Sequence, residues 1–80
     1  MDELNHRLED IFREVFQDNT LRINDETKSD DVARWDSLGH LRLLSTVERE
    51  FDVTFTLDET MSIVSVSDLK RIVKARAAGI

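Results

Sequence analysis

The sequence predicts an all-α fold, a small four-helix bundle with three main helices, one short helix and a long first loop. The 80 residues include no proline and only two glycines, so the chain lacks the turn residues that a β-rich fold needs. Apolar residues make up 40% of the chain and recur in three stretches at helical spacing. The length leaves room for one domain, which we expect to span residues 1–80.

The first helix is expected over residues 2–17, with Asp2 as a possible N-cap. Its apolar positions repeat with a helical period and are Leu4, Leu8, Ile11, Phe12, Val15 and Phe16. Residues 18–35 have no such period and are rich in Asn, Asp, Thr and Ser, which favours a long loop. A loop of this length is unusual in a compact domain unless it has a function. Within it, Leu21, Ile23 and Val32 are expected to reach the core.

The second helix is expected over residues 37–51, with Asp36 as its N-cap. A helical projection places Leu38 on the solvent side, and it places on the core side Leu41, Leu43, Leu44, Val47 and Phe51.

Residues 52–64 are expected to form a connection. Residues 53–55 alternate like a short strand that has no partner, and residues 58–61 could form one helical turn. Ser65 and Asp68 have the spacing of a capping box, which predicts a last helix to about Ala78 that Gly79 would stop.

Composition excludes several classes of protein. Without cysteine the chain can form neither disulfides nor thiolate metal sites, and it has no Cys nucleophile. A net charge of -6 disfavours nucleic-acid binding, and no apolar run approaches the roughly 18 residues that cross a membrane. The N-terminus is acidic where a signal peptide would be basic. We therefore expect a cytoplasmic protein. A stand-alone chain is favoured because the sequence begins with Met1 and lacks linker composition at either end, and a monomer is the default.

Catalytic and metal-binding interpretations are weak. Asp36, Ser37 and His40 supply the residue types of a hydrolase triad, but one helix holds all three and no nucleophile elbow is present. His40 is expected at the edge of the core and His6 at the surface. The acidic stretch 25–31 lacks the alternating ligands and central glycine of a calcium loop. We therefore expect neither an enzyme nor a metal site.

The most informative feature is the serine that opens the second helix. Ser37 follows the long loop, where a phosphate would face free backbone N–H groups and the positive helix end. Alone, the sequence Asp36-Ser37-Leu38 is no more than an ordinary capping sequence. Together with the helix that ends in residues 48–52 (EREFD) and the order of the elements, it resembles the acyl carrier protein family. The resemblance covers most of the chain and is clearest over residues 35–73.

This resemblance implies that Ser37 carries 4′-phosphopantetheine, taken from coenzyme A and attached through a phosphodiester. The terminal thiol would hold acyl groups as thioesters, so the chemistry would belong to the prosthetic group. The implied partners are a phosphopantetheinyl transferase and enzymes that load and transfer acyl groups. Asp36 would cap the helix beside the attachment point, with a possible second role toward the transferase. Leu38 would offer these enzymes an apolar contact.

Two departures from the family pattern bear on the pathway. The residue before the motif is Trp35 instead of glycine or another small residue; it could shield the base of the arm or, as we favour, plug the loop against the core.

The second helix is nearly neutral where fatty-acid carriers are strongly acidic. Acidic residues outnumber basic ones 11 to 5 in residues 1–36, while residues 37–80 hold six of each. Electrostatic matching guides the choice of partner, so a specialised pathway (polyketide, nonribosomal peptide, polysaccharide or modified lipid) is favoured. The expected partner contacts are Leu38, Trp35, Arg42, Glu48 and Arg49, on a face that also includes Gly39 and has Glu50 nearby.

Several alternatives remain open. The chain could be the carrier of housekeeping fatty-acid synthesis, an unmodified carrier-like interaction module, an unrelated helical adaptor or, least favoured, a small hydrolase. Ser45 and Thr46 either line an acyl cavity, which would indicate a short or polar cargo, or simply face solvent. The second interpretation is slightly favoured.

Overall fold

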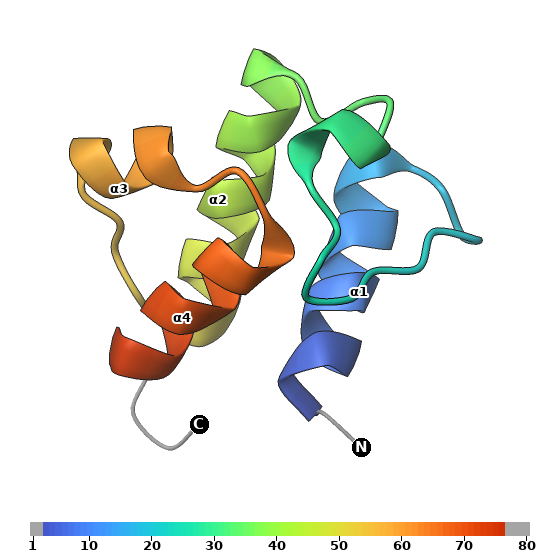
Figure 1. The fold of residues 1–80 in the computed structure, drawn as a ribbon. Coiled ribbons are helices and arrows are strands. Elements are labelled where there is room, and N and C mark those ends of the chain that lie inside the picture. Colours follow the sequence, from blue (N-terminus) through green and yellow to red (C-terminus); the bar gives the residue numbers. More distant parts are fainter. Residues whose placement is uncertain (1–2, 77–80) are drawn as a thin grey trace.

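In a computed structural model, which describes residues 3–76, four α-helices pack around one core (Figure 1). They are α1 (Glu3–Phe16), α2 (Ser37–Phe51), α3 (Leu57–Ser62) and α4 (Val66–Arg76), with a 3₁₀ turn, η1 (Ser29–Asp31), in the first loop. Within the described residues the only β-type pairing is one isolated antiparallel bridge between Lys28 and Ser65. The predicted all-α fold, with three main helices, one short helix and a long first loop, is confirmed.

The helix boundaries follow local capping. α2 begins and ends at the predicted residues, because Asp36 caps its start and Asp52 adopts a left-handed conformation after its end. α3 is longer than the single turn predicted, because Thr56 and Glu59 form a reciprocal capping box that was not predicted. The proposed N-cap at Asp2 and the proposed stop at Gly79 lie outside the described residues.

The core is formed by one face of each main helix together with apolar residues of the connections. Ile23 and Val32 bury the first loop as expected, while Leu21 and Val15 are only partly buried. Val53 and Phe55 are also buried, although their segment forms no strand. Leu41 was placed in the core by the helical projection, and that placement is wrong: its side chain is 56% exposed. It lies at the edge of the apolar face, where α2 and α3 leave a groove between them.

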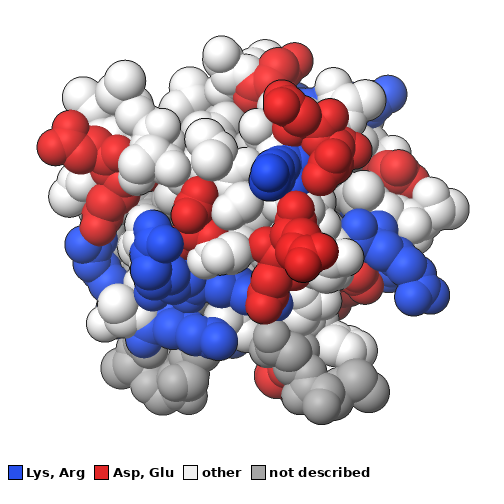
Figure 2. Space-filling view, viewed as in Figure 1, with Lys and Arg blue, Asp and Glu red and all other residues white. Residues whose placement is uncertain are grey.

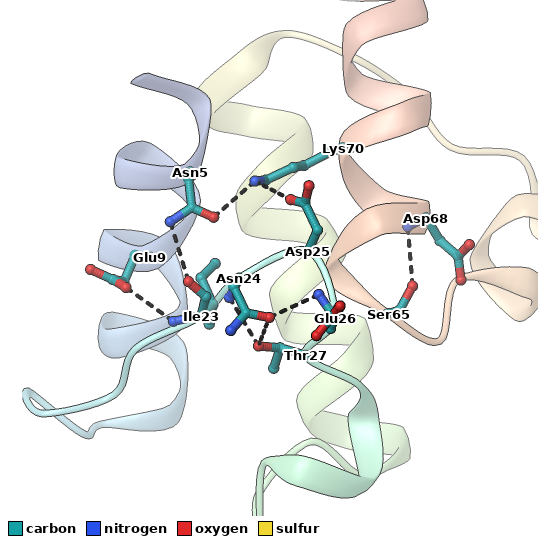
Figure 3. Close-up of polar contacts among 10 residues, drawn as sticks. All are labelled: Asn5, Glu9, Ile23, Asn24, Asp25, Glu26, Thr27, Ser65, Asp68 and Lys70. Carbon is teal, nitrogen blue, oxygen red and sulfur yellow. Dashed lines mark hydrogen bonds and ion pairs between the residues drawn. The ribbon is translucent and has the colours of Figure 1, made fainter. Parts of the chain in front are cut away.

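The long loop between α1 and α2 is fixed by polar contacts as well as by apolar ones (Figure 3). Both backbone groups of Ile23 are bonded to α1: its N–H donates to Glu9 (3.0 Å) and its carbonyl accepts from Asn5 (3.3 Å). On the other side, Val66 N–H donates to the Thr27 carbonyl at 2.9 Å. The loop is therefore held between α1 and the start of α4, which gives the residues before Ser37 a defined path.

Lys70 joins the same assembly from α4. It lies in a basic stretch with Arg71, Lys74 and Arg76, yet it is 5% exposed. Its ammonium group donates to Asp25 of the loop (2.6 Å) and to Asn5 of α1 (2.8 Å), as Figure 3 shows. Burial of this cation is tolerated because these oxygens replace its hydration shell. Lys70 thus links α4, the loop and α1.

Within residues 3–76, no helix is both long and apolar enough to span a bilayer. No group of three or more His, Asp or Glu side chains in residues 3–76 is arranged to hold a metal ion.

Candidate functional site

The site is built at the first turn of α2, which Figure 1 shows at the end of the molecule opposite to the start of α1 and the end of α4. Asp36 has extended backbone angles, and its carboxylate accepts the Gly39 N–H at 2.9 Å. This confirms Asp36 as the N-cap. Ser37 is the first helical residue and is exposed, and Leu38 beside it is 59% exposed, as predicted. The serine hydroxyl is thus accessible at the positive end of a helix.

Gly39 allows the loop to approach this turn closely. A Cβ atom built on Gly39 would lie 2.2 Å from the Arg34 carbonyl oxygen and 2.9 Å from a ring carbon of Phe16. The residue is buried, so its expected place on the partner-facing surface is wrong. Its role is steric: only the absence of a side chain lets the loop cross α2 here.

Trp35 fills the space beneath the attachment turn. Its side chain is 6% exposed and packs edge-on against Phe12, with ring centroids 5.2 Å apart, and beside Phe16 at 6.3 Å. The favoured interpretation of Trp35 as a plug between loop and core is confirmed. Such burial leaves it little surface for a partner, so we do not retain Trp35 among the partner contacts.

His40 connects three segments through its two ring nitrogens. The Trp35 indole N–H donates to Nδ1 at 2.8 Å, and Nε2 lies 2.7 Å from the Thr60 carbonyl of α3. Because indole is only a donor, Nδ1 must be the unprotonated nitrogen, and Nε2–H donates to Thr60. Both nitrogens are thus engaged away from Ser37, and the Asp36 carboxylate is engaged with Gly39. This arrangement does not provide the activated serine of a hydrolase.

A groove of about 510 Å³ lies between α2 and α3, with Ser37 at its rim. Trp35, His40 and Ile63 are among the residues that line it. Four exposed apolar side chains also line it, two of them more than 70% exposed: Leu41, Leu57, Met61 and Val64. Leu57 and Met61 lie in the segment predicted as a connection, and none of these four residues was predicted to belong to the site. The spacing of Leu57 and Met61 by four residues was the available signal, since it places both on one side of a helical turn.

The remaining partner candidates occupy the outer part of α2. Arg42 and Arg49 are exposed, whereas Glu48 is half-buried and its carboxylate accepts the Phe55 N–H at 2.8 Å. Glu48 therefore fixes the connection after α2 in addition to any contact with a partner. Ser45 is exposed, and the Thr46 hydroxyl donates to the Arg42 carbonyl of its own helix at 2.9 Å. Neither side chain belongs to the buried core, which favours the interpretation that they face solvent.

The surface charge is distributed unevenly around these elements. Figure 2 shows acidic side chains gathered over the first loop and η1, and basic ones over the lower end of α4. The exposed acidic residues of the loop include Asp25, Glu26, Asp30 and Asp31. Acidic charge is therefore gathered on the loop and on α1, whereas the exposed residues of α2 include two arginines and Glu50.

The arrangement fits a phosphate-linked prosthetic group. An exposed hydroxyl at a helix N-terminus can carry a phosphodiester where the helix end favours negative charge. The neighbouring apolar groove offers space for whatever the phosphate carries. The comparisons with known proteins agree with this chemistry.

A family model described as "Phosphopantetheine attachment site" matches residues 6–73. Among solved structures, the chain is similar to a holo acyl carrier protein from Geobacter metallireducens, with 34% identity and a TM-score of 0.84. That match covers 91% of this chain and 84% of the other. A search of the curated proteins gave no significant match. Members of the phosphopantetheine-attachment family act as non-catalytic carriers with 4′-phosphopantetheine as the prosthetic group. The fold, the exposed serine that opens α2 and these matches show that the chain belongs to this family.

Proposed function

We propose that Ser37 is the residue that carries 4′-phosphopantetheine and that the protein presents acyl thioesters to partner enzymes. The observation that supports this most strongly is the exposure of Ser37 at the capped first turn of α2, on the rim of an apolar groove. Asp36 shapes this turn, and Leu38 offers an exposed apolar contact beside it. The partners would be a phosphopantetheinyl transferase and enzymes that load and transfer the acyl group. We further propose that the protein acts as a monomer in the cytoplasm.

The attachment step needs only coenzyme A as co-substrate. The Ser37 hydroxyl oxygen forms a bond to the phosphorus nearest the pantetheine, and the pyrophosphate bond of coenzyme A breaks. Adenosine 3′,5′-bisphosphate leaves, and the hydroxyl proton passes to a base of the transferase or to water. On this chain the buried Trp35 and the Asp36 cap hold the turn that presents the hydroxyl.

Intact-mass measurement tests this attachment. The protein is incubated with coenzyme A, Mg²⁺ and a broad-specificity phosphopantetheinyl transferase, next to a Ser37→Ala variant. We expect a gain of one phosphopantetheine on the wild type and none on Ser37→Ala. A second exposed serine of α2 provides the matched control, because Ser45→Ala should be loaded like the wild type. Loading of Ser37→Ala would contradict the assignment, and failure to load the wild type would indicate either a dedicated transferase or an unmodified interaction module.

We also propose that the carrier serves a specialised pathway instead of housekeeping fatty-acid synthesis. The exposed face of α2 holds Arg42 and Arg49, and a partner with a basic docking patch would be repelled there. A complementary partner would present acidic or neutral side chains to this face. A polyketide, nonribosomal peptide, polysaccharide or modified-lipid pathway remains compatible with this surface.

Turnover with a ketosynthase of general bacterial fatty-acid synthesis tests this second proposal. We expect weak binding of the loaded wild type and tighter binding of the double variant Arg42→Glu/Arg49→Glu. Arg22→Glu, an exposed charge reversal in the first loop, controls for net charge alone. Efficient turnover of the wild type, with no gain in the double variant, would favour the housekeeping alternative.

A further inference from the structure

The groove beside Ser37 is open to solvent, and its least exposed lining side chains separate it from the interior of the bundle. Trp35 and His40 both line the groove, and both extend into the protein. The two rings are stacked, with an interplanar angle of 21° and centroids 6.1 Å apart. A group that entered the groove from Ser37 and moved inward at this point would therefore meet two rings.

Hydrogen bonds hold this pair of rings in place. Trp35 Nε1–H donates to His40 Nδ1, and His40 Nε2–H donates to the Thr60 carbonyl, so the loop, α2 and α3 are connected in series. The Thr60 N–H in turn donates to the carbonyl of Thr56, the N-cap of α3. Displacing either ring would leave at least one polar group without its partner in a partly buried position.

The aromatic side chains of α1 that pack against Trp35 restrict displacement of the two rings. Trp35 contacts Phe12 and Phe16 of α1, and Phe12 is fully buried. Close-packed interiors do not make room for an additional chain without shifting several side chains at once. By contrast, the outer walls of the groove are exposed apolar side chains that an acyl group could cover at no such cost, Leu57 and Met61 above all.

We propose that the hydrogen-bonded series Trp35–His40–Thr60 closes the bundle interior to the cargo, so that the acyl group stays in the groove between α2 and α3. This inference rests on the proposed attachment at Ser37. The groove volume of about 510 Å³ lies within the usual range for small-ligand sites, roughly 300–1,000 Å³. An open groove that is closed at its inner side can cover more of a short acyl group than of a long one, whose end stays in water. Trp35 and His40 thereby act as specificity-determining residues that favour short acyl groups.

Two single-residue reporters make this testable by NMR. Trp35 is the only tryptophan of the chain, so its indole N–H resonance reports on the closed interior. Met61 is one of two methionines, and its methyl group reports on the groove wall. The protein is loaded from acetyl-, butyryl-, octanoyl- and myristoyl-coenzyme A by the transferase, and intact mass verifies each product.

We expect the Met61 methyl resonance to shift from the acetyl to the butyryl form and to change little with longer chains. The Trp35 indole resonance should keep its position and its slow hydrogen exchange in all four forms. A shift of the indole resonance, or faster exchange, that grows from butyryl to myristoyl would overturn the proposal. Absence of loading would count against the proposed function and not against the closed interior, so the two failures are distinguishable by mass.

Variants of the series supply the converse test. His40→Ala removes the bridge to α3, and we expect its indole resonance to shift with increasing acyl length. Ser45→Ala, on the exposed outer part of the same helix, should behave as the wild type. An His40→Ala protein whose indole resonance stays insensitive to long chains would also overturn the proposal. The measurements on the four acylated forms of the wild type test the proposal without any variant, so the proposal stays testable if His40→Ala folds poorly.

Discussion

At the scale of single residues, the attachment turn depends on a few side chains that shape the backbone around Ser37. Asp36 was predictable as a cap, because Asp before an apolar-periodic stretch is a local signal. Gly39 and His40 were not, because their roles depend on Arg34, Phe16 and Thr60, which local sequence spacing does not bring together. A glycine inside a helix is unfavourable by itself, and here the close approach of the loop explains it.

Gly39→Ala should therefore destabilise the protein although alanine is the better helix former. The new Cβ would overlap the Arg34 carbonyl oxygen, a backbone atom that cannot rotate away. Overpacking of this kind costs about 2 kcal/mol, and a urea unfolding curve would measure it. Ser45→Ala, at an exposed position of the same helix, should stay within about 0.5 kcal/mol of the wild type. Equal stability of Gly39→Ala and the wild type would show that the loop does not pass as closely as described.

At the scale of elements, helix positions and core faces were accessible from sequence, and the path of the long loop was not. The helical period of the apolar residues predicted α1, α2 and α4, since one apolar face per helix is a local pattern. The loop is held by contacts that are distant in sequence, above all Lys70 with Asp25 and with Asn5. A lysine in an amphipathic helix is expected at the surface, so nothing local indicated that Lys70 would be buried.

The link between α4 and the loop predicts an unequal response to two substitutions. Asp25→Ala removes the carboxylate that pairs with a buried ammonium group. Lys70→Met keeps an apolar side chain of similar length in place. It leaves the Asp25 carboxylate facing water, where that side chain is already 69% exposed. We expect Asp25→Ala to be the more destabilising variant, by about 1 kcal/mol. Thermal unfolding at neutral pH compares them. The opposite order would mean that Lys70 contributes through its packing more than through the ion pair.

At the scale of the whole molecule, several carboxylates accept hydrogen bonds in the folded protein, and this makes stability depend on pH. The Val64 N–H, which donates to Asp68, lowers the pKa of that carboxyl below its ordinary value. Bonds from Thr20 lower the pKa of Asp18, and the Arg76 guanidinium lowers the pKa of Glu59. The Asp68 contact joins the segment after α3 to the first turn of α4.

Because each pKa is lower in the folded state, the stabilisation is fully present above the ordinary pKa values and is lost as pH falls through the folded ones. We expect the melting temperature to be flat near neutral pH and to decline below about pH 4. Asp68→Asn should lower the melting temperature at pH 7 and flatten part of the acid-induced decline. An Asp68→Asn protein with the acid dependence of the wild type would show that other carboxylates are responsible.

The central claim is that Ser37, among all hydroxyl side chains of the chain, carries the prosthetic group. Peptide-level tandem mass spectrometry of the wild-type protein, loaded from coenzyme A and digested, tests this most directly. The account predicts that every phosphopantetheine is found on Ser37, where the capped helix start exposes the hydroxyl beside the groove. Phosphopantetheine on Ser45, Ser29 or another hydroxyl residue would contradict it.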